Sequence, residues 1–529
     1  MVRFWAAAAA AALGAAAGSQ EAGQRRTICF ALYTTHRGIL KLTAQLYPLA
    51  AGDPRTAALE VMRDGAWREV ATAPVVEEGW TVHFRVEGWD ASRSVRYRVR
   101  HGASSYEGLV RRDPVDKEVV VAAAFTGNSP GPGGGRISRK DLVEYVAKVD
   151  PDVLLFTGDQ VYDHNDHTRH WIRFGEDFGE VIRDRPTVTI PDDHDVGHPN
   201  LWGQGGRPAR QDWEGGYLKP PSYVNMVQRQ QTWHLPDPYD PTPVEQGITV
   251  YYTSLNVGGV DFAILEDRKW KTGCGGLRVV ERRLGPRPDH VTSKEVDPKE
   301  FDVPGAELLG ERQLRFLRVW GQDWRGAVFK AVVSQTIFSM AQNYHSKDES
   351  FYVADLDSNG WPQSGRNAAL REMRRAFAFH ICGDQHLGAI VQYGIDEWGD
   401  AGYAFCVPSI ANLYPRWWKP ERPGLDREPG APEYTGKFHD GLGNKMTVWA
   451  VSNPSKTGRE PAELHDRAPG WGLVRFDKKK RTITMECWPR MIDPTDPAHA
   501  GLQYPGWPHT IHQLDNYGRA AAAWLPTLE

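Results

Sequence analysis

Hydrophobic and polar residues alternate along the first part of the chain, between about residues 27 and 113. Thr81–Val86 and Ser94–Val99 both carry apolar side chains at every second position, as a strand with one buried face does. Within residues 59–67, an Asp64-Gly65 pair separates two strand-like segments, and such a pair is the strongest short signal for a β-hairpin. This pattern predicts a small all-β sandwich over residues 26–115.

Continuous apolar runs replace the alternating pattern after residue 118. Residues 138–149 carry apolar side chains at helical spacing, and Ser138 and Asp141 are placed to form a capping box. Strands and helices in this order predict an α/β domain over residues 118–515. Four short runs are typical of strands buried on both faces: Val119–Phe125, Val153–Phe156, Thr187–Ile190 and Phe377–Cys382.

The rest of this domain gives weaker signals. Residues 249–253 and 260–265 are predicted to pair as strands, and residues 308–320 to form a helix. Two strands at 471–476 and 482–488 are predicted to flank a basic turn. Residues 198–241, rich in Gly, Pro and Trp, are expected to form one long ordered loop that walls the site.

Composition narrows the class of protein. The 529 residues exceed one ordinary domain, and 40% hydrophobic with 25% charged residues is typical of a globular protein. The net charge of −4 gives no reason to expect nucleic acid or an anionic membrane as partner, and we expect a monomer. Five widely spaced cysteines do not form a disulfide scaffold or a zinc ribbon, which leaves room for one disulfide.

The amino terminus resembles a secretory signal. Residues 1–18 begin with Arg3, continue as an almost pure Ala/Leu run and end in Ala15-Ala16-Ala17. We predict cleavage near Ala17 and a periplasmic or secreted protein; the alternative is a fortuitous Ala-rich helix. After this segment no apolar run is long enough to span a bilayer.

Acidic and histidine side chains follow three of the predicted strands. Asp159 comes after the 153–156 run, Asp192-Asp193-His194-Asp195 after the 187–190 run, and Asp384-Gln385-His386 after the 377–382 run. Chemistry in open α/β sheets lies just beyond the carboxyl ends of strands, so these residues are expected to meet. A mixed set of carboxylates and imidazoles suits a two-metal hydrolase. Any one of the motifs alone would be read as an ordinary turn.

In order, Gly158-Asp159, Asp192–Asp195 and Gly383–His386 resemble the motif series of the calcineurin-like metallophosphoesterases. The longer string from Gly158 to Asp163, with Asp192–Asp195, is similar to the PhoD-type alkaline phosphatase branch of that superfamily. The resemblance implies two sheets flanked by helices, preceded by an immunoglobulin- or fibronectin-like sandwich. The motifs are spread over roughly half of the chain.

By this resemblance two metal ions bind, with Fe and Ca favoured and Zn or Mn as alternatives. The implied metal ligands are Asp159 as a bridge, Tyr162, Asp192, Asp193, Asp384 and His386. The chain departs from the pattern in its first loop, Thr126-Gly127-Asn128, because Gly127 stands where PhoD-like chains have a cysteine ligand. Asn128 could supply an oxygen in its place.

The catalytic prediction centres on His194, which falls on the family's histidine for the transition state. Its imidazole suits proton transfer near neutral pH, and Asp195 is expected to orient the ring. The predicted activity is hydrolysis of phosphomonoesters or phosphodiesters by water that the metals activate. Two alternatives stay open: a hydrolase of another ester, such as a sulfate or a phosphorylated surface polymer, and a non-catalytic envelope- or glycan-binding protein.

Overall fold

The computed structural model describes residues 25–130, 137–277, 287, 289–412 and 414–518. An all-β unit comes first, with hydrogen-bonded strand order β1-β2-β5-β4-β3-β6-β7. The predicted Asp64-Gly65 turn joins β3 to β4, and both residues have positive φ angles, 51° and 76°. The seven strands are β1 Ile28–His36, β2 Ile39–Leu46, β3 Thr56–Arg63, β4 Ala66–Val76, β5 Thr81–Glu87, β6 Val95–His101 and β7 Ser104–Val110.

A six-stranded sheet follows, in the order β10-β9-β8-β24-β25-β26. Strands β8, β9 and β10 run parallel, as buried strands joined by helical crossovers do. The predicted basic hairpin is formed by β24 and β25. The six strands are β8 Val119–Phe125, β9 Val153–Phe156, β10 Thr187–Thr189, β24 Gly470–Asp477, β25 Thr482–Pro489 and β26 His509–His512.

A second sheet has eight strands in the order β11-β12-β14-β18-β20-β19-β23-β22. Its central strands β12, β14, β18 and β20 are parallel. The strands are β11 Thr253–Val257, β12 Val260–Ile264, β14 Phe329–Thr336, β18 Phe379–Gly383, β19 Ala389–Tyr393, β20 Tyr403–Cys406, β22 Gly436–His439 and β23 Lys445–Val451. Five short strands make small ladders beside it: β13 His290–Val291, β15 Tyr344–His345, β16 Ser350–Phe351, β17 Ala354–Asp355 and β21 Arg416–Trp417.

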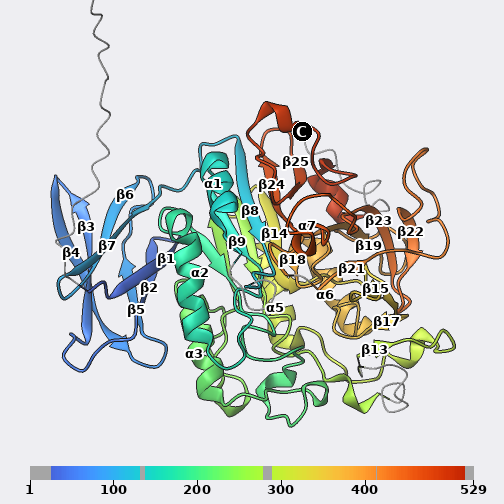
Figure 1. Cartoon of the computed structure of the whole chain (residues 1–529), viewed down its shortest axis with the longest axis horizontal. Helices are drawn as coiled ribbons and strands as arrows, with labels where there is room; N and C mark the ends of the chain where they lie inside the picture. Colours follow the sequence, from blue (N-terminus) through green and yellow to red (C-terminus); the bar gives the residue numbers. More distant parts are fainter. Residues whose placement is uncertain (1–24, 131–136, 278–286, 288, 413, 519–529) are drawn as a thin grey trace, which may run out of the picture.

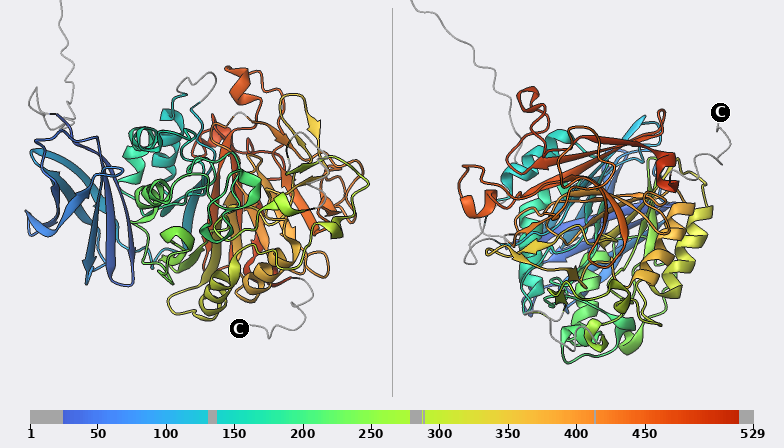
Figure 2. Two further views of the ribbon diagram at one scale, coloured as in Figure 1. Left: turned by 90° about the horizontal axis from the view of Figure 1, so that it is seen from below. Right: turned by 90° about the vertical axis from the view of Figure 1, so that its right-hand side faces the viewer.

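The two large sheets pack face to face with helices on their outer faces (Figures 1 and 2). One apolar cluster lies between the sheets and draws side chains such as Val153 from the first and Phe329 from the second. Outside the first sheet lie α1 Lys140–Val149 and α2 His167–Ile182; outside the second lie α5 Gly310–Gln322 and α6 Gln363–Arg375. This layered arrangement is the mixed α/β architecture that the sequence predicts.

Aromatic packing joins the first unit to the larger domain. Phe30 of β1 meets Trp171 and Phe174 of α2 edge-on, with ring centroids 5.4 and 6.3 Å apart. All three side chains are almost fully buried. Because these side chains are buried together, the first unit packs against the larger domain through a continuous apolar contact. The two parts are therefore not joined by a flexible linker alone.

Three local predictions are wrong. Residues 198–241 do not form one long loop, because they contain the helix α3 Pro221–Thr232, which begins with a proline whose missing N–H costs nothing at a first turn. Ser138 and Asp141 do not form a capping box: α1 begins at Lys140, and Asp141 binds Arg490 instead. The strand expected at 249–253 lies at 253–257, where it pairs with β12.

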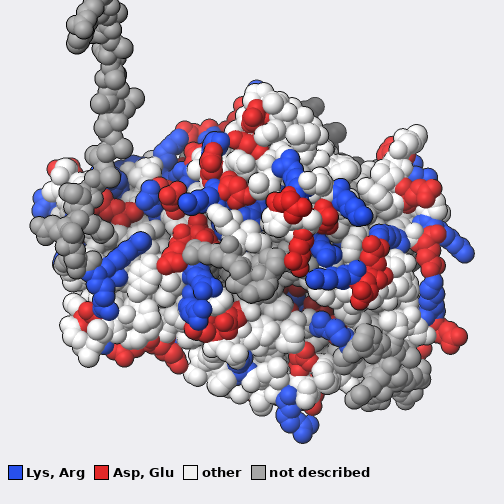
Figure 3. Space-filling view, in the orientation of Figure 1, with Lys and Arg blue, Asp and Glu red and all other residues white. Residues whose placement is uncertain are grey.

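Two further predictions can be set beside the structure. All five cysteines lie in the described part of the chain, where each is free and buried, so no disulfide forms. None of the helices there, including the short α7 Ala462–His465, is long and apolar enough to cross a bilayer. The predicted signal segment, residues 1–18, lies outside the described residues. On the face in Figure 3, basic and acidic side chains are interspersed.

Candidate metal centre

The carboxyl ends of β8, β9 and β18 lie close together. Phe125 and Phe156 are the last paired residues of β8 and β9, and the Thr157 N–H donates to the Phe125 carbonyl at 2.9 Å. The Asp384 N–H, just past β18, reaches the hydroxyl of Thr126 at 3.3 Å. A side chain on Gly383 would overlap the hydroxyls of Thr126 and Thr157, so glycine is required for this approach.

Asp159 lies at the centre of the convergence, with a positive φ of 63° that places its carboxylate beyond the strand end. Its Oδ2 accepts a hydrogen bond from the Tyr162 hydroxyl at 2.6 Å and lies 3.8 Å from Nε2 of His386. Its Oδ1 is buried and has no hydrogen-bond partner among the residues that the structure describes. Burial opposes ionisation, but His194, His386 and Tyr162 outweigh it and hold the pKa of Asp159 below its usual range.

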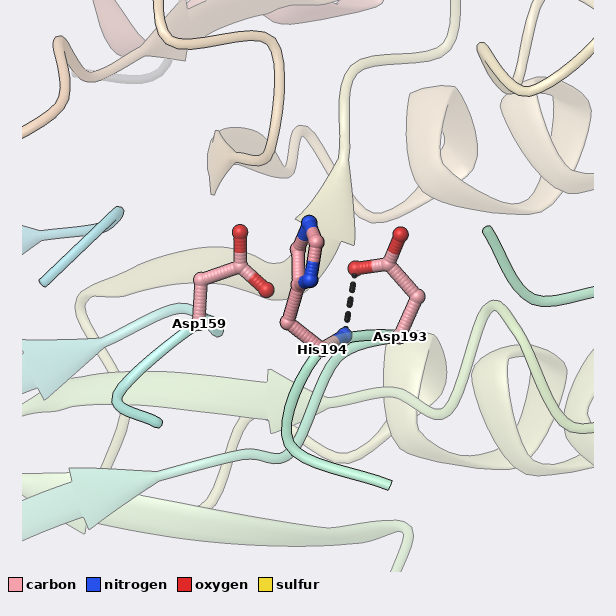
Figure 4. A group of neighbouring side chains, drawn as sticks. All are labelled: Asp159, Asp193 and His194. Carbon is pink, nitrogen blue, oxygen red and sulfur yellow. Dashed lines mark hydrogen bonds between the residues drawn. The ribbon is translucent and has the colours of Figure 1, made fainter. Parts of the chain in front are cut away.

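Asp193 and His194 come to Asp159 from the loop after β10. One ligand atom from each of the three residues lies within 4.8 Å of the others, and Figure 4 shows the His194 ring between the two carboxylates. Asp193 Oδ1 also accepts from the His194 N–H at 2.8 Å. Burial and the neighbouring carboxylates of Asp192 and Asp159 raise the pKa of Asp193 well above its ordinary value. Such a group gains most when a cation binds beside it.

A second histidine holds the His194 ring. His164 Nε2 lies 2.8 Å from His194 Nδ1, and the Tyr162 ring packs on the other side with centroids 4.4 Å apart. His194 Nε2 has no hydrogen-bond partner among the described residues. Burial lowers the pKa of His194 and so favours the neutral imidazole. Nothing in the local sequence around His164 points to this contact with His194.

Asp195 does not orient that ring, so this prediction is corrected. Its Oδ2 accepts from the N–H groups of Asp159 and Asp192 at 2.8 and 2.9 Å. Its Oδ1 accepts from the Val161 N–H at 2.9 Å and from Gln231 Nε2 at 2.8 Å. Asp195 is fully buried, and it joins the loop of Asp159 and the loop of Asp192 to each other and to α3. Burial and the Asp159 charge raise its pKa to about 7, although these four donors favour the carboxylate.

Asp192 and Asp384 lie close to Asp193, but both are bound by an arginine. The carboxylates of Asp192, Asp193 and Asp384 approach within 4.8 Å of one another. Arg268, four residues past the end of β12, donates to Asp192 and Asp384 at 2.7 Å each, and to Asp357 at 2.6 Å. Burial and the other carboxylates raise the pKa values of Asp192 and Asp384, the latter to about 7.

The first loop, Thr126-Gly127-Asn128, leaves no free space for a side chain at Gly127. A side chain at Gly127 would lie 2.6 Å from the Ser409 hydroxyl and 3.3 Å from Cβ of Asn412, so these two residues fill the place of the expected ligand. Asn412 Nδ2 donates to the Tyr162 hydroxyl at 2.6 Å. Asn128 is turned away from Asp159, because its amide oxygen accepts from Arg139 and its amide nitrogen donates to the Gln160 carbonyl.

Arg268, Asp357, Asn412 and His164 are thus site residues whose roles local sequence patterns do not give. Each lies on a separate loop and meets its partner only through the sheet order. The Arg268 side chain is 2% exposed and its guanidinium is held by three carboxylates. It is therefore not free to grip a substrate phosphate.

Comparison with known proteins gives a fold. No protein-family model matches the sequence, and no curated protein matches it. A solved structure of PhoD matches 87% of this chain and 85% of its own, at 13% identity and a TM-score of 0.57. The chain therefore shares the fold of that PhoD structure. A purple acid phosphatase from seeds of yellow lupin (Lupinus luteus) matches at 12% identity, 87% and 71% coverage and a TM-score of 0.49.

A dimetal phosphatase from Danio rerio also matches, with 10% identity, coverage of 72% and 97% and a TM-score of 0.37. In this chain Asp159, Asp193 and His386 follow the carboxyl ends of β9, β10 and β18, and open α/β sheets bind ligands at such strand ends.

Proposed function

We propose that this chain is a metal-dependent hydrolase of phosphoric esters, acting on phosphomonoesters, phosphodiesters or both. The observation that carries the proposal is the buried Oδ1 of Asp159, which has no hydrogen-bond partner in the described part of the chain. Ligand atoms of Asp193 and His194 lie within 4.8 Å of an Asp159 oxygen. A buried carboxylate oxygen without a donor costs free energy that a bound cation would recover. The PhoD fold supports the reaction class.

The residues present fit a divalent or trivalent metal ion. Asp159, Asp193, Tyr162 and His386 offer carboxylate, phenol and imidazole donors, a mixture that hard and borderline cations accept. A metal held there would activate water and neutralise charge on the phosphoryl oxygens. Fe and Ca are the ions that the resemblance favours. Asn128 is the least suited of the predicted ligands, because its side chain is already engaged.

His194 is proposed to assist the leaving group. When His164 donates from Nε2, His194 Nδ1 accepts and the His194 proton is held on Nε2, the nitrogen without a partner. That N–H can donate to a phosphoryl oxygen or to the departing alkoxide. His164 therefore has a positioning role, because it selects the tautomer in which the free nitrogen carries a proton.

The proposal is tested by metal analysis and by hydrolysis of chromogenic phosphomonoester and phosphodiester substrates. His194→Ala is expected to keep its metal and to lose turnover by about 10²–10³-fold, the usual contribution of one hydrogen-bond donor to the transition state. Asp159→Asn is expected to lose both metal and turnover. His439→Ala, at an exposed histidine on β22, is the control and should behave as wild type. Metal-free, inactive wild-type protein, or undiminished turnover of His194→Ala, would refute the proposal.

Export is part of the same proposal and is tested separately. We propose that residues 1–18 direct the chain out of the cytoplasm and are removed near Ala17. Amino-terminal sequencing of protein recovered from the periplasm or the medium should begin within a few residues of Gly18. Recovery of full-length protein from the cytoplasm alone would contradict it.

A further inference from the structure

Arg268 is a buried charge whose environment is fully specified. Its side chain is 2% exposed, and those of Asp192, Asp357 and Asp384 are 5% exposed or less. Nε binds Asp192, Nη1 binds Asp357 and Nη2 binds Asp384, so every nitrogen of the guanidinium has a carboxylate partner. Charge-assisted bonds of this geometry are among the strongest that proteins make, and removing one partner leaves an uncompensated buried charge.

Without Arg268, the carboxylates of Asp192 and Asp384 would suit a metal ion. Oxygens of Asp192, Asp193 and Asp384 lie within 4.8 Å of one another, close enough to be drawn onto a single ion. Two of these three residues turn an oxygen to Arg268 at 2.7 Å. A hard cation prefers such oxygens, so the guanidinium and a metal ion compete for the same two carboxylates.

We infer that Arg268 is a built-in cation that keeps a metal ion off the Asp192–Asp384 pair. The metal of the proposed function, on which this inference rests, then binds on the Asp159 side alone. Asp192 and Asp384 hold the arginine and are not ligands. Arg268 is packed under three strand ends. Its positive charge therefore stays in this place at all times and does not depend on whether metal ions are available.

The test counts Mn²⁺ ions per chain in full-length protein that has been stripped with a chelator, reloaded with excess Mn²⁺ and desalted. Arg268→Met is expected to hold one ion more than wild type, because Asp192 and Asp384 lose their arginine and, with Asp193, can accept the metal. Arg490→Met is the matched control. Arg490 is also 2% exposed and binds Asp141 at 3.1 Å, a carboxylate outside the Asp192, Asp193 and Asp384 group, and this variant should match wild type.

An Arg268→Met protein with the wild-type ion count would overturn the inference. Should that variant fail to fold, Asp384→Asn decides: an unchanged count supports the inference, and the loss of one ion overturns it. Failure of the proposed function gives a different result, because wild type would then hold no ion while Arg268→Met could still gain one. Thermal unfolding adds an independent readout, since Mn²⁺ should raise the Tm of Arg268→Met more than that of Arg490→Met.

Discussion

Asp195→Asn separates two roles for this residue, orienting the catalytic histidine or holding the loops together. Each Asp195 oxygen accepts two N–H groups: those of Asp159 and Asp192 on one, and those of Val161 and Gln231 on the other. In asparagine one oxygen becomes an NH₂ group, so two of the four buried donors lose their acceptor. At about 1–3 kcal/mol for each, the loops should be destabilised by about 2–6 kcal/mol.

Amide hydrogen exchange measures this loss where it occurs. Peptides that cover residues 157–163 and 190–196 should exchange faster by about 30-fold to 10⁴-fold, at about 1.4 kcal/mol per tenfold change. The control is Asp116→Asn, an exposed acid that pairs with Arg112 at 2.7 Å and should leave exchange in these peptides unchanged. Unchanged exchange in Asp195→Asn, with lower turnover, would refute the loop-holding role and restore the orienting role.

Three further predictions concern separate parts of the molecule. Asn412→Ala removes the amide that donates to the Tyr162 hydroxyl and should weaken metal binding by about 10–100-fold in a metal titration. His164→Ala should lower kcat by about 10–100-fold with unchanged metal content, and His164→Gln should restore part of it by donating to His194. Burial lowers the pKa of His234 to about 3. As the pH falls below 6.5, His234 therefore takes up a proton in the unfolded chain but not in the folded protein. Stability is therefore lost below pH 6.5, and His234→Gln, which keeps the bond to Thr187, should make denaturation less steeply dependent on pH between 3 and 6.5.

The strand predictions succeed where burial is complete and the run is short. Val153–Phe156 is a strand over the predicted residues, because four apolar side chains fill both faces of a parallel sheet. The Asp64-Gly65 hairpin forms because its positive φ angles are intrinsic to those residues. Local preference and tertiary structure agree at these places. Residues 221–232 were missed because the Pro and polar residues of α3 give no clear helical period.

The site divides in the same way. That Asp159, Asp193, His194 and His386 lie beyond strand ends follows from the order of apolar runs and polar ends, so the sequence alone determined that they could meet. What each one bonds to depends on residues far away in the chain, as His164 and Asn412 show.

The clearest division is at Asp192, Asp384 and Asp195, for which the sequence determined residue type and approximate place only. A carboxylate can bind a metal, an arginine or a set of backbone N–H groups, and local sequence does not distinguish these partners. The order of strands in the two sheets brought Arg268 to the first two residues, and the position of α3 brought Gln231 to the third. Burial makes these pairings necessary, because a charge removed from water requires a partner at hydrogen-bond distance. Only the tertiary structure supplies that partner.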